Sequence, residues 1–563
     1  MTSLSTIMKL AESFETYLGN PFLKATPLNF EQILLLDEEE TLPRAHIEFI
    51  RQWGYMEYLI PHQFGGKMQS LMDMYALTRC LSRRDLTTAI TLGITVLSSL
   101  PVWIAGSKEQ KIAEATRIKK GLIGCLALTE EAHGSDLTAN EVFAEPYEGG
   151  WRLSGKKWCV NYATLTNHAT VLCRTHPSGG ALGFSLFRVD KTAVKTGIHH
   201  LPKLLTTGVR GLDISGFVLD KVIVPEDALI GQKKGGLEVT YKALQVSRTL
   251  CASFSLGAAD TALRLALKFS LERHLYGESV YAIPAVKQRL AENFIYLLIG
   301  DCMALAMARA CTVIPRRMSF WSAIVKFFIP KLSEAIIDEC GTVIGARAYL
   351  RTTEWAIFQK IKRDNQVVGL FDGSSQVNLF IIVGNLVSQA KMRKAHQIDA
   401  KALLKAIFDL NEPIPDFTGE KLGVFNSGQD EIISALWSLK STKIKPLVTR
   451  VIEEVVKLDN EILKRQEQSR FDKRGLAEFR LAEKYCWLFA ASCVLQSSVY
   501  NQENLPVALK NSEWLTLAIE LILSKLNANN AINPLFQNAM ADCLTTFYDQ
   551  KMMFSLLPII IKG

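Results

Sequence analysis

The order in which two hydrophobic patterns follow one another constrains the fold of this 563-residue chain more than any other feature. Residues 1–124 and 232–410 carry apolar residues at helical spacing, and the segments are longer in the second region. Between them, residues 125–231 form short β-branched and aromatic runs separated by turn formers such as Glu148-Gly149-Gly150 and Ser178-Gly179-Gly180. The sequence therefore predicts a mostly α protein with an N-terminal helical domain, a central β domain and a helical bundle.

The last quarter of the chain adds a further helical region. Residues 411–425, with two prolines, two glycines and scattered charges, are predicted to be a linker. Beyond them, residues 426–563 are predicted to form a C-terminal helical extension, in which Val448, Val451, Ile452 and Val455 line one stripe. The apolar ending "MMFSLLPIIIKG" is expected to pack on the bundle rather than to touch a membrane surface.

Charge and cysteine usage exclude several classes of protein. The extension holds 16 Lys or Arg against 15 Asp or Glu, which is too balanced for a phosphate-binding face, so no nucleic-acid partner is expected. Eleven cysteines occur without a CxxC pair or a histidine at zinc-ligand spacing. We expect reduced core thiols, no metal site and a cytoplasmic protein.

One segment has the length of a membrane span. Residues 86–107 contain no charge, but they are diluted by Thr, Ser and Gly and are followed by a strongly polar run. A buried helix that ends before Pro101 is predicted instead, and no transmembrane segment is expected.

Specific motifs follow one another along the domains. They are "LALTEEAHGSD" (126–136), "GKKWCVN" (155–161), "VRGLDISGFVLDKVIVPEDALIG" (209–231), "LERHLYG" (271–277) and "RDNQVVGLFDGSSQVN" (363–378). The succession resembles the acyl-CoA dehydrogenase family, whose members are flavoenzymes that desaturate acyl thioesters between Cα and Cβ. The resemblance covers about residues 30–400 in order, so chance is an unlikely explanation for it.

The resemblance implies FAD as the cofactor. Small and hydroxyl residues in the first motif allow donors to approach a flavin and its pyrophosphate closely, and a flat indole suits the face of the ring. The cofactor-binding residues that it implies are Leu126, Leu128, Thr129, Ser135, Trp158, Val160, Arg273, Tyr276, Ser374 and Gln376. Arg273 matches an arginine that reaches the cofactor across a subunit interface. For the substrate, the resemblance implies Ser135, Arg248 and Gly373.

The proposed catalytic base is Asp372, in "LFDGSSQVN". By itself, an Asp before a Gly-Ser-Ser turn is usually a cap or turn residue. In the family pattern, however, this position holds the carboxylate that takes the Cα proton while Cβ gives hydride to flavin N5. Asp is one methylene shorter than the usual Glu, and a displacement of about an ångström can cost on the order of a hundredfold in rate.

Other departures leave three interpretations open. Val160 stands where a Thr or Ser usually hydrogen-bonds flavin N5, Pro284 replaces a Gln, and the family's glycine-rich loop appears only as "TVIGARAY" (342–349). The first interpretation is a dehydrogenase acting on acyl-CoA or a carrier-protein thioester, with an electron-transfer flavoprotein as acceptor. The second is an oxidase that uses oxygen, and the third is a non-catalytic structural or regulatory paralogue. Because extensions of this length go with dimers in the family, a homodimer is expected.

Overall fold

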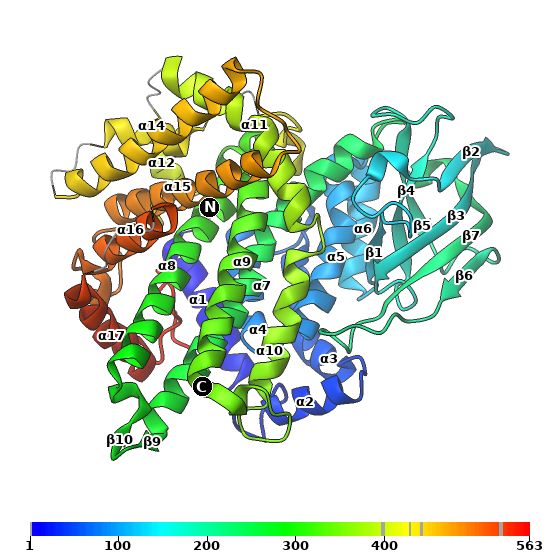
Figure 1. The fold of residues 1–563 in the computed structure, drawn as a ribbon. Helices are drawn as coiled ribbons and strands as arrows, with labels where there is room; N and C mark the ends of the chain where they lie inside the picture. The colour runs from blue at the N-terminus through cyan, green and yellow to red at the C-terminus, as the bar shows by residue number, and fades with distance from the viewer. Residues whose placement is uncertain (1–2, 396–399, 427–429, 440–442, 528–532) are drawn as a thin grey trace.

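The computed structural model describes residues 3–395, 400–426, 430–439, 443–527 and 533–563. The chain forms a helical N-terminal domain, a β domain, a helical bundle and a helical extension, in that order (Figure 1). The predicted mostly α fold with a central β domain is therefore confirmed. The N-terminal domain consists of α1 (Leu4–Leu18), α2 (Phe30–Glu38), α3 (Arg44–Gln52), α4 (Leu71–Ser82), α5 (Leu86–Ala105) and α6 (Lys108–Lys119).

The β domain is one mixed sheet in the order β6-β7-β3-β2-β4-β5-β8, with β1 paired in parallel to β4. Its strands are β1 (Gly124–Ala127), β2 (Phe143–Tyr147), β3 (Gly150–Asn161), β4 (His168–Arg174), β5 (Phe184–Asp190), β6 (Ile198–Leu201), β7 (Ile214–Pro225) and β8 (Leu229–Ile230). The predicted loop between β2 and β3 is a tight turn, with Glu148 and Gly149 both at positive φ. The right-handed twist of such a turn matches that of the strands that it joins.

The bundle is built around three long helices that are buried among their neighbours. Its helices are α7 (Gly236–Glu272), α8 (Pro284–Val313), α9 (Met318–Ile344), α10 (Ile357–Gln366) and α11 (Ser375–Ala395). By length and composition, α5, α7 and α8 are apolar enough to cross a membrane, but 83–100% of the most apolar window of each is buried inside the protein. Their apolar character therefore serves the core of a large helical protein.

Helix α5 differs from the prediction at its end. It runs through Pro101 to Ala105 rather than ending before the proline. The Thr170 hydroxyl of β4 donates to the carbonyl of Ser98 at 2.9 Å, so the β domain satisfies a backbone group in the turn before the proline. Burial of α5 between the bundle and the sheet outweighs the local cost of the proline.

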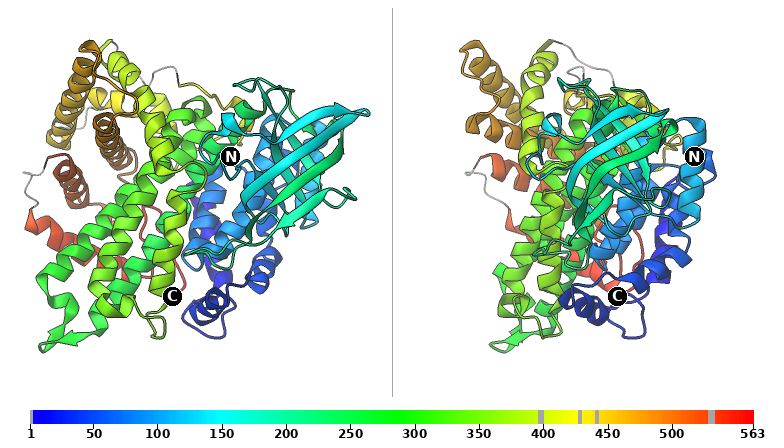
Figure 2. Two further views of the ribbon diagram at one scale, coloured as in Figure 1. Left: turned by 45° about the vertical axis from the view of Figure 1, so that its right-hand side comes forward. Right: turned by 90° about the vertical axis from the view of Figure 1, so that its right-hand side faces the viewer.

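The extension covers the side of the bundle that faces away from the β domain (Figures 1 and 2). Its helices are α13 (Glu431–Ser434), α14 (Lys445–Glu467), α15 (Leu476–Tyr500), α16 (Glu513–Leu526) and α17 (Pro534–Asp549), while α12 (Lys401–Phe408) comes before the predicted linker. The predicted linker between bundle and extension is packed rather than free in solvent. Ile414, Phe417 and Leu422 are buried, and the Phe417 backbone N–H donates to the carbonyl of Gln69 at 2.7 Å.

Candidate active site

Asp372 lies in a turn between α10 and α11, preceded by the single helical turn η8 (Val367–Gly369). Asp372 and Gly373 both have left-handed backbone, with φ of 55° and 96°. Asp tolerates left-handed backbone better than most residues. At Gly373, any side chain would be strained by this backbone conformation, and its Cβ would lie 2.9 Å from the guanidinium of Arg248. Gly373 is therefore required for backbone conformation and for close approach to Arg248.

Helix α7 holds this turn from one side. Arg248 donates from Nε to the Asp372 carbonyl oxygen at 2.8 Å, and the Cys251 thiol lies 3.9 Å from a carboxylate oxygen of Asp372. On the other side of the turn, the Asn378 amide donates to the carbonyl oxygens of Gly373 and Ser374. The backbone that carries the carboxylate is thus fixed at consecutive residues.

The Asp372 side chain faces a small apolar cavity of about 60 Å³. The cavity is lined by Met74, Thr78, Ile90, Gly93, Ile94, Val96, Leu97, Asn161, Ser247, Leu250, Phe254, Phe371 and Asp372. Helices α4, α5 and α7, the end of β3 and the turn before α11 therefore meet at one place. Asp372 is the one ionisable group among these lining residues.

Burial raises the pKa of the Asp372 carboxyl above its ordinary value. Lys326 opposes this effect most strongly, followed by a hydrogen bond from Ser247, the charge of Arg248 and a hydrogen bond from Cys251. A carboxylate with a raised pKa in an apolar cavity has the character of a general base.

The predicted flavin contacts on the β domain come from β1, the loop after it and β3, and β3 ends at the cavity-lining residue Asn161. Leu126 lies in β1, Leu128 and Thr129 follow this strand, and Trp158 lies on β3. The Trp158 backbone N–H donates to the Thr129 carbonyl at 3.0 Å, which places these two residues side by side. All four residues are half-buried, as expected for the wall of a site that another molecule would cover.

The loop that carries Thr129 is held by a buried ion pair that the sequence analysis missed. Lys157 donates to Glu130 at 2.8 Å and to the Leu128 carbonyl at 2.9 Å, and the side chain of Lys157 is fully buried. Glu130 also accepts hydrogen bonds from the backbone of Glu141 and Val142. Further along this loop, Ser135 is exposed, and a Cβ at Gly134 would meet nothing within 4 Å.

Val160 does not lie where its predicted cofactor contact requires. Its side chain is 2% exposed and packs in the core of the β domain, whereas Asn161 lines the cavity with Asp372. The reason is a bulge in β3: its register against β7 shifts between Trp158 and Val160, and Cys159 has a φ of 57°. Asn161, rather than Val160, is therefore the residue of this strand that lines the cavity.

The remaining predicted residues lie in two places. Ser374 and Gln376 are at the start of α11, where the Ser374 hydroxyl accepts from the Val377 N–H. Arg273 and Tyr276 are exposed on the hairpin of β9 (His274–Leu275) and β10 (Glu278–Ser279), which projects from the bundle away from the β domain (Figure 1). The hairpin contributes no residue to the lining of the cavity.

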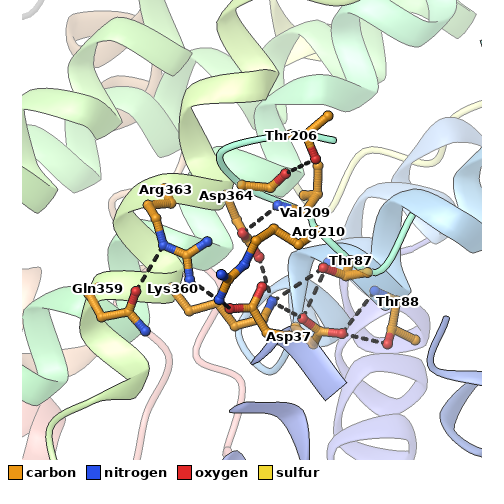
Figure 3. Close-up of polar contacts among 12 residues, drawn as sticks. Asp37, Thr87, Thr88, Thr206, Val209, Arg210, Gln359, Lys360, Arg363 and Asp364 are labelled. Carbon is orange, nitrogen blue, oxygen red and sulfur yellow. Dashed lines mark hydrogen bonds and ion pairs between the residues drawn. The ribbon is translucent and has the colours of Figure 1, made fainter. Parts of the chain in front are cut away.

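Helix α10, which leads into the turn that carries Asp372, is anchored by buried charges (Figure 3). Lys360 donates to Asp85 at 2.6 Å and pairs with Asp364, whose other oxygen accepts from the Val209 backbone N–H at 2.6 Å. These partners come from the N-terminal domain, α10 itself and the loop before β7. The network therefore joins three domains at one point.

A third carboxylate, Asp37 of α2, extends this junction. It pairs with Arg210 of the β domain at 2.5 Å and with Arg363 of α10 at 2.6 Å (Figure 3). Both arginine pairs lower the pKa of Asp37 against the effect of its burial.

Lys360→Met is expected to lower the free energy of unfolding by about 3–5 kcal/mol, because it leaves Asp85 and Asp364 buried without their cation. Urea unfolding followed by circular dichroism measures the change. Lys405→Met is the matched control, since Lys405 forms an exposed ion pair with Glu412 and no measurable change is expected. Equal stability of the two variants would show that the buried network does not hold α10.

Comparison with known proteins agrees with this geometry. Family models match all three domains: the acyl-CoA dehydrogenase N-terminal domain over residues 31–119, the middle domain over 125–222 and the C-terminal domain over 234–387. Human mitochondrial short-chain specific acyl-CoA dehydrogenase is 25% identical over 356 residues, which are 62% of this chain and 84% of that protein.

Solved structures show the same fold. Butyryl-CoA dehydrogenase from Megasphaera elsdenii has 19% identity and a TM-score of 0.60, over 69% of this chain and 98% of that one. An acyl-CoA dehydrogenase from Bacillus anthracis, solved with FAD, has 16% identity and a TM-score of 0.62, over 98% of this chain and 97% of that one. The second match includes the C-terminal extension.

The fold and the matched domains define an oxidoreductase of the flavoprotein class. The chain belongs to the acyl-CoA dehydrogenase family, and the predicted resemblance is confirmed.

Proposed function

We propose that this protein is an FAD-dependent dehydrogenase of short acyl thioesters, with Asp372 as the base that removes the Cα proton. The observation that carries the proposal is the apolar cavity with one ionisable lining residue, Asp372, held by Arg248 at its own carbonyl. A weakly acidic C–H bond is broken most readily by a base in an apolar place from which water is excluded.

The residues on the β-domain side of the cavity fit a flavin. Thr129 and Trp158 form a half-buried wall, and the Asn161 amide offers a donor and an acceptor that have no partner among the described residues. The open space beside Gly134 leaves room for a phosphate-bearing chain. When bound there, FAD would accept the hydride from the substrate Cβ.

The chain's own residues would handle the proton and the thioester. The Asp372 carboxylate would take the Cα proton, the Cα–Cβ double bond would form, and the hydride would leave from Cβ. The Asp372 backbone N–H forms no hydrogen bond with the residues that the structure describes, so it is available to the thioester oxygen. Arg248 keeps this N–H and the carboxylate in one orientation by holding the carbonyl of the same residue.

The size of the cavity supports a short acyl chain. A water-sized group needs about 10–15 Å³ on this measure, so about 60 Å³ accommodates roughly four to six such groups. Phe254 lines the cavity and packs edge-to-face on Phe371 at 6.3 Å between ring centroids. The short-chain specificity named for the human relative agrees with this size.

Phe254→Ala is expected to shift the preference toward longer chains, because it removes a wall of the cavity. The ratio of kcat/KM for octanoyl-CoA to that for butyryl-CoA should rise by about tenfold or more. Phe380→Ala, at an exposed position of α11, is the matched control and should leave the ratio unchanged. An unchanged ratio in Phe254→Ala would show that this ring does not limit chain length.

A visible absorption spectrum of the purified protein tests the proposed function. We expect a flavin spectrum that is bleached under anaerobic conditions by butyryl-CoA or by a butyryl carrier protein. The thioester that bleaches the flavin faster is the better substrate. Slow recolouring in air supports an electron-transfer flavoprotein as acceptor, whereas rapid recolouring supports an oxidase. Failure to bind FAD would favour the non-catalytic paralogue.

The proposal includes a cytoplasmic homodimer. Tyr276 is 97% exposed on its hairpin, and only a second copy of the chain could bring this hairpin and Arg273 to a cofactor. Ten of the eleven cysteines are buried and all eleven are free, as suits a reducing compartment. Sedimentation equilibrium of the purified protein tests the dimer, and a monomer with bound flavin would contradict it.

A further inference from the structure

The catalytic turn is held by two buried cations that approach it from different helices. Arg248 comes from α7, and Lys326 comes from α9; they are 5% and 1% exposed. Each donates a hydrogen bond to a backbone carbonyl of the turn region, Arg248 to Asp372 and Lys326 to Val368. Among the residues that the structure describes, neither has a carboxylate within ion-pair distance.

Lys326 makes two contacts with the turn region, both outside its own helix. Its ammonium group donates to the Val368 carbonyl in η8, and it lies 5.2 Å from the centroid of the Phe371 ring. Val368 and Phe371 both precede the left-handed bend at Asp372 and Gly373, which carries Asp372 to the cavity. The position of this lysine therefore bears directly on the position of the carboxylate.

The charge of Lys326 also acts on the carboxylate itself. Burial raises the pKa of Asp372, and Lys326 is the strongest influence that lowers it. Conversely, burial lowers the pKa of Lys326, while Cys251 and then Asp372 oppose that effect. The Lys326 ammonium group and the Asp372 carboxylate are therefore close enough for each charge to change the pKa of the other.

Stability does not explain a lysine at this position. An ammonium group taken out of water without a carboxylate partner costs several kcal/mol, whereas a methionine of similar length would fill the same space without that cost. The benefit of the charge must then lie in what it does to the turn and to Asp372.

We propose that Lys326 is a positioning residue for Asp372: it fixes the turn through the Val368 carbonyl, and its charge keeps the carboxylate ionised in an apolar cavity. For its chemical meaning, this inference rests on the proposed function. Helix α9 contributes no residue to the cavity lining. Under this proposal, α9 nevertheless acts on the reaction through Lys326.

Few other ionisable groups face this site. Arg248 and Cys251 approach Asp372 from α7, and Tyr241 acts on Arg248 from the same helix. Glu334 of α9 lies beside Gly369 and acts on Lys326. The residues of α4, α5 and β3 that line the cavity carry no ionisable group.

The direct test is an infrared pH titration of the Asp372 carboxyl group. For each protein, the spectrum of the same protein with Asp372→Asn added is subtracted, so that the difference reports the carboxyl group of Asp372 alone. In Lys326→Met, the midpoint should rise by about 1–3 pH units, because a neighbouring opposite charge has been removed. Lys326→Arg keeps the charge and the donor, so its midpoint should stay near that of the parent. Lys331→Met, an exposed lysine of the same helix, should not move it.

The same variants make a prediction for the flavin reaction. The Asp372 base must be ionised, so the bleaching rate falls as pH drops through its pKa; in Lys326→Met, this fall should begin at higher pH and the rate should recover in alkali. A loss of rate that is equal at every pH, with an unchanged infrared midpoint, would overturn the proposal in favour of a structural role.

The two readouts separate this inference from the proposed function. A shifted midpoint in a protein that no thioester bleaches would support the role of Lys326 toward Asp372 and refute the dehydrogenase. Should Lys326→Met fail to fold, Lys326→Gln, which keeps an N–H donor without the charge, should show the same upward shift. An unshifted midpoint in that variant would overturn the proposal.

Discussion

The Asp372→Asn protein is expected to bind flavin normally and to lose thioester-driven bleaching by about 10²- to 10⁴-fold, the usual contribution of a general base. Asn has nearly the same shape as Asp, so the contact of Arg248 with the backbone carbonyl should survive. What disappears is the only ionisable group among the cavity-lining residues. Anaerobic stopped-flow absorbance with butyryl-CoA measures the rate.

The pH profile of the parent protein gives an independent check on this assignment. Because burial raises the pKa of Asp372, the bleaching rate should fall with decreasing pH at values above those usual for an aspartate, and Asp372→Asn should lack this limb. Asp220→Asn, at an exposed position of β7, is the matched control and should behave like the parent. Full bleaching rates in Asp372→Asn would remove Asp372 from the mechanism.

The sequence predicted the elements of this fold better than their ends. The spacing of hydrophobic residues and turn formers separated the β domain from the helices. Glu148-Gly149-Gly150 indicated a hairpin, which the structure contains. The predicted end of α5 was wrong because burial between the bundle and the sheet carries the helix through Pro101. Local rules describe the cost of a proline but not the contacts that compensate for it.

The candidate site shows the same limit at the level of single residues. The motif pointed to Asp372, which the structure places at a cavity. One bulge at Cys159, however, turns Val160 into the core and brings Asn161 to that cavity. Alternation of side chains along a strand cannot reveal where an extra residue is inserted.

The two buried lysines that support the site were missed for a different reason. Lys157 and Lys326 read as ordinary polar residues of a strand and a helix, because Glu130 and Val368, which they contact, are distant in sequence. A lysine inside an otherwise apolar run, such as "AIVKFFIP" around Lys326, was the one signal available for α9.

The C-terminal segment, residues 552–563, packs against helices of the bundle and of the N-terminal domain, and its packing on the bundle was predicted from its apolar composition. The Phe554 backbone donates to Asp260 of α7 and accepts from Arg79 of α4, each at 2.8 Å. The next residues, Ser555 and Leu556, both donate to Asp301 of α8 at 2.6 and 2.7 Å. The segment therefore completes buried polar groups on three helices.

Apolar burial adds to these hydrogen bonds. Seven side chains of the segment are buried: Met552, Met553, Phe554, Leu556, Leu557, Ile559 and Ile561. Each is worth about 1.5–3 kcal/mol on burial. Together they are comparable to the whole stability of a typical folded protein, about 5–15 kcal/mol.

Deletion of residues 552–563 is therefore expected to abolish cooperative folding, and Phe554→Ala to lower the free energy of unfolding by about 3–5 kcal/mol. Phe554 is fully buried, packs on Phe294 at 5.5 Å between ring centroids, and has the Arg264 guanidinium 3.8 Å from its own ring centroid. Its truncation therefore leaves a cavity and removes the cation–π contact with Arg264. Ile560→Ala, at a residue of the same segment that is 44% exposed, should change the free energy of unfolding by much less.

Urea unfolding of the two point variants gives the comparison, and calorimetry of the protein without residues 552–563 shows whether an unfolding transition remains. A deleted protein that melts like the parent would show that the buried carboxylates of α7 and α8 do not need this segment.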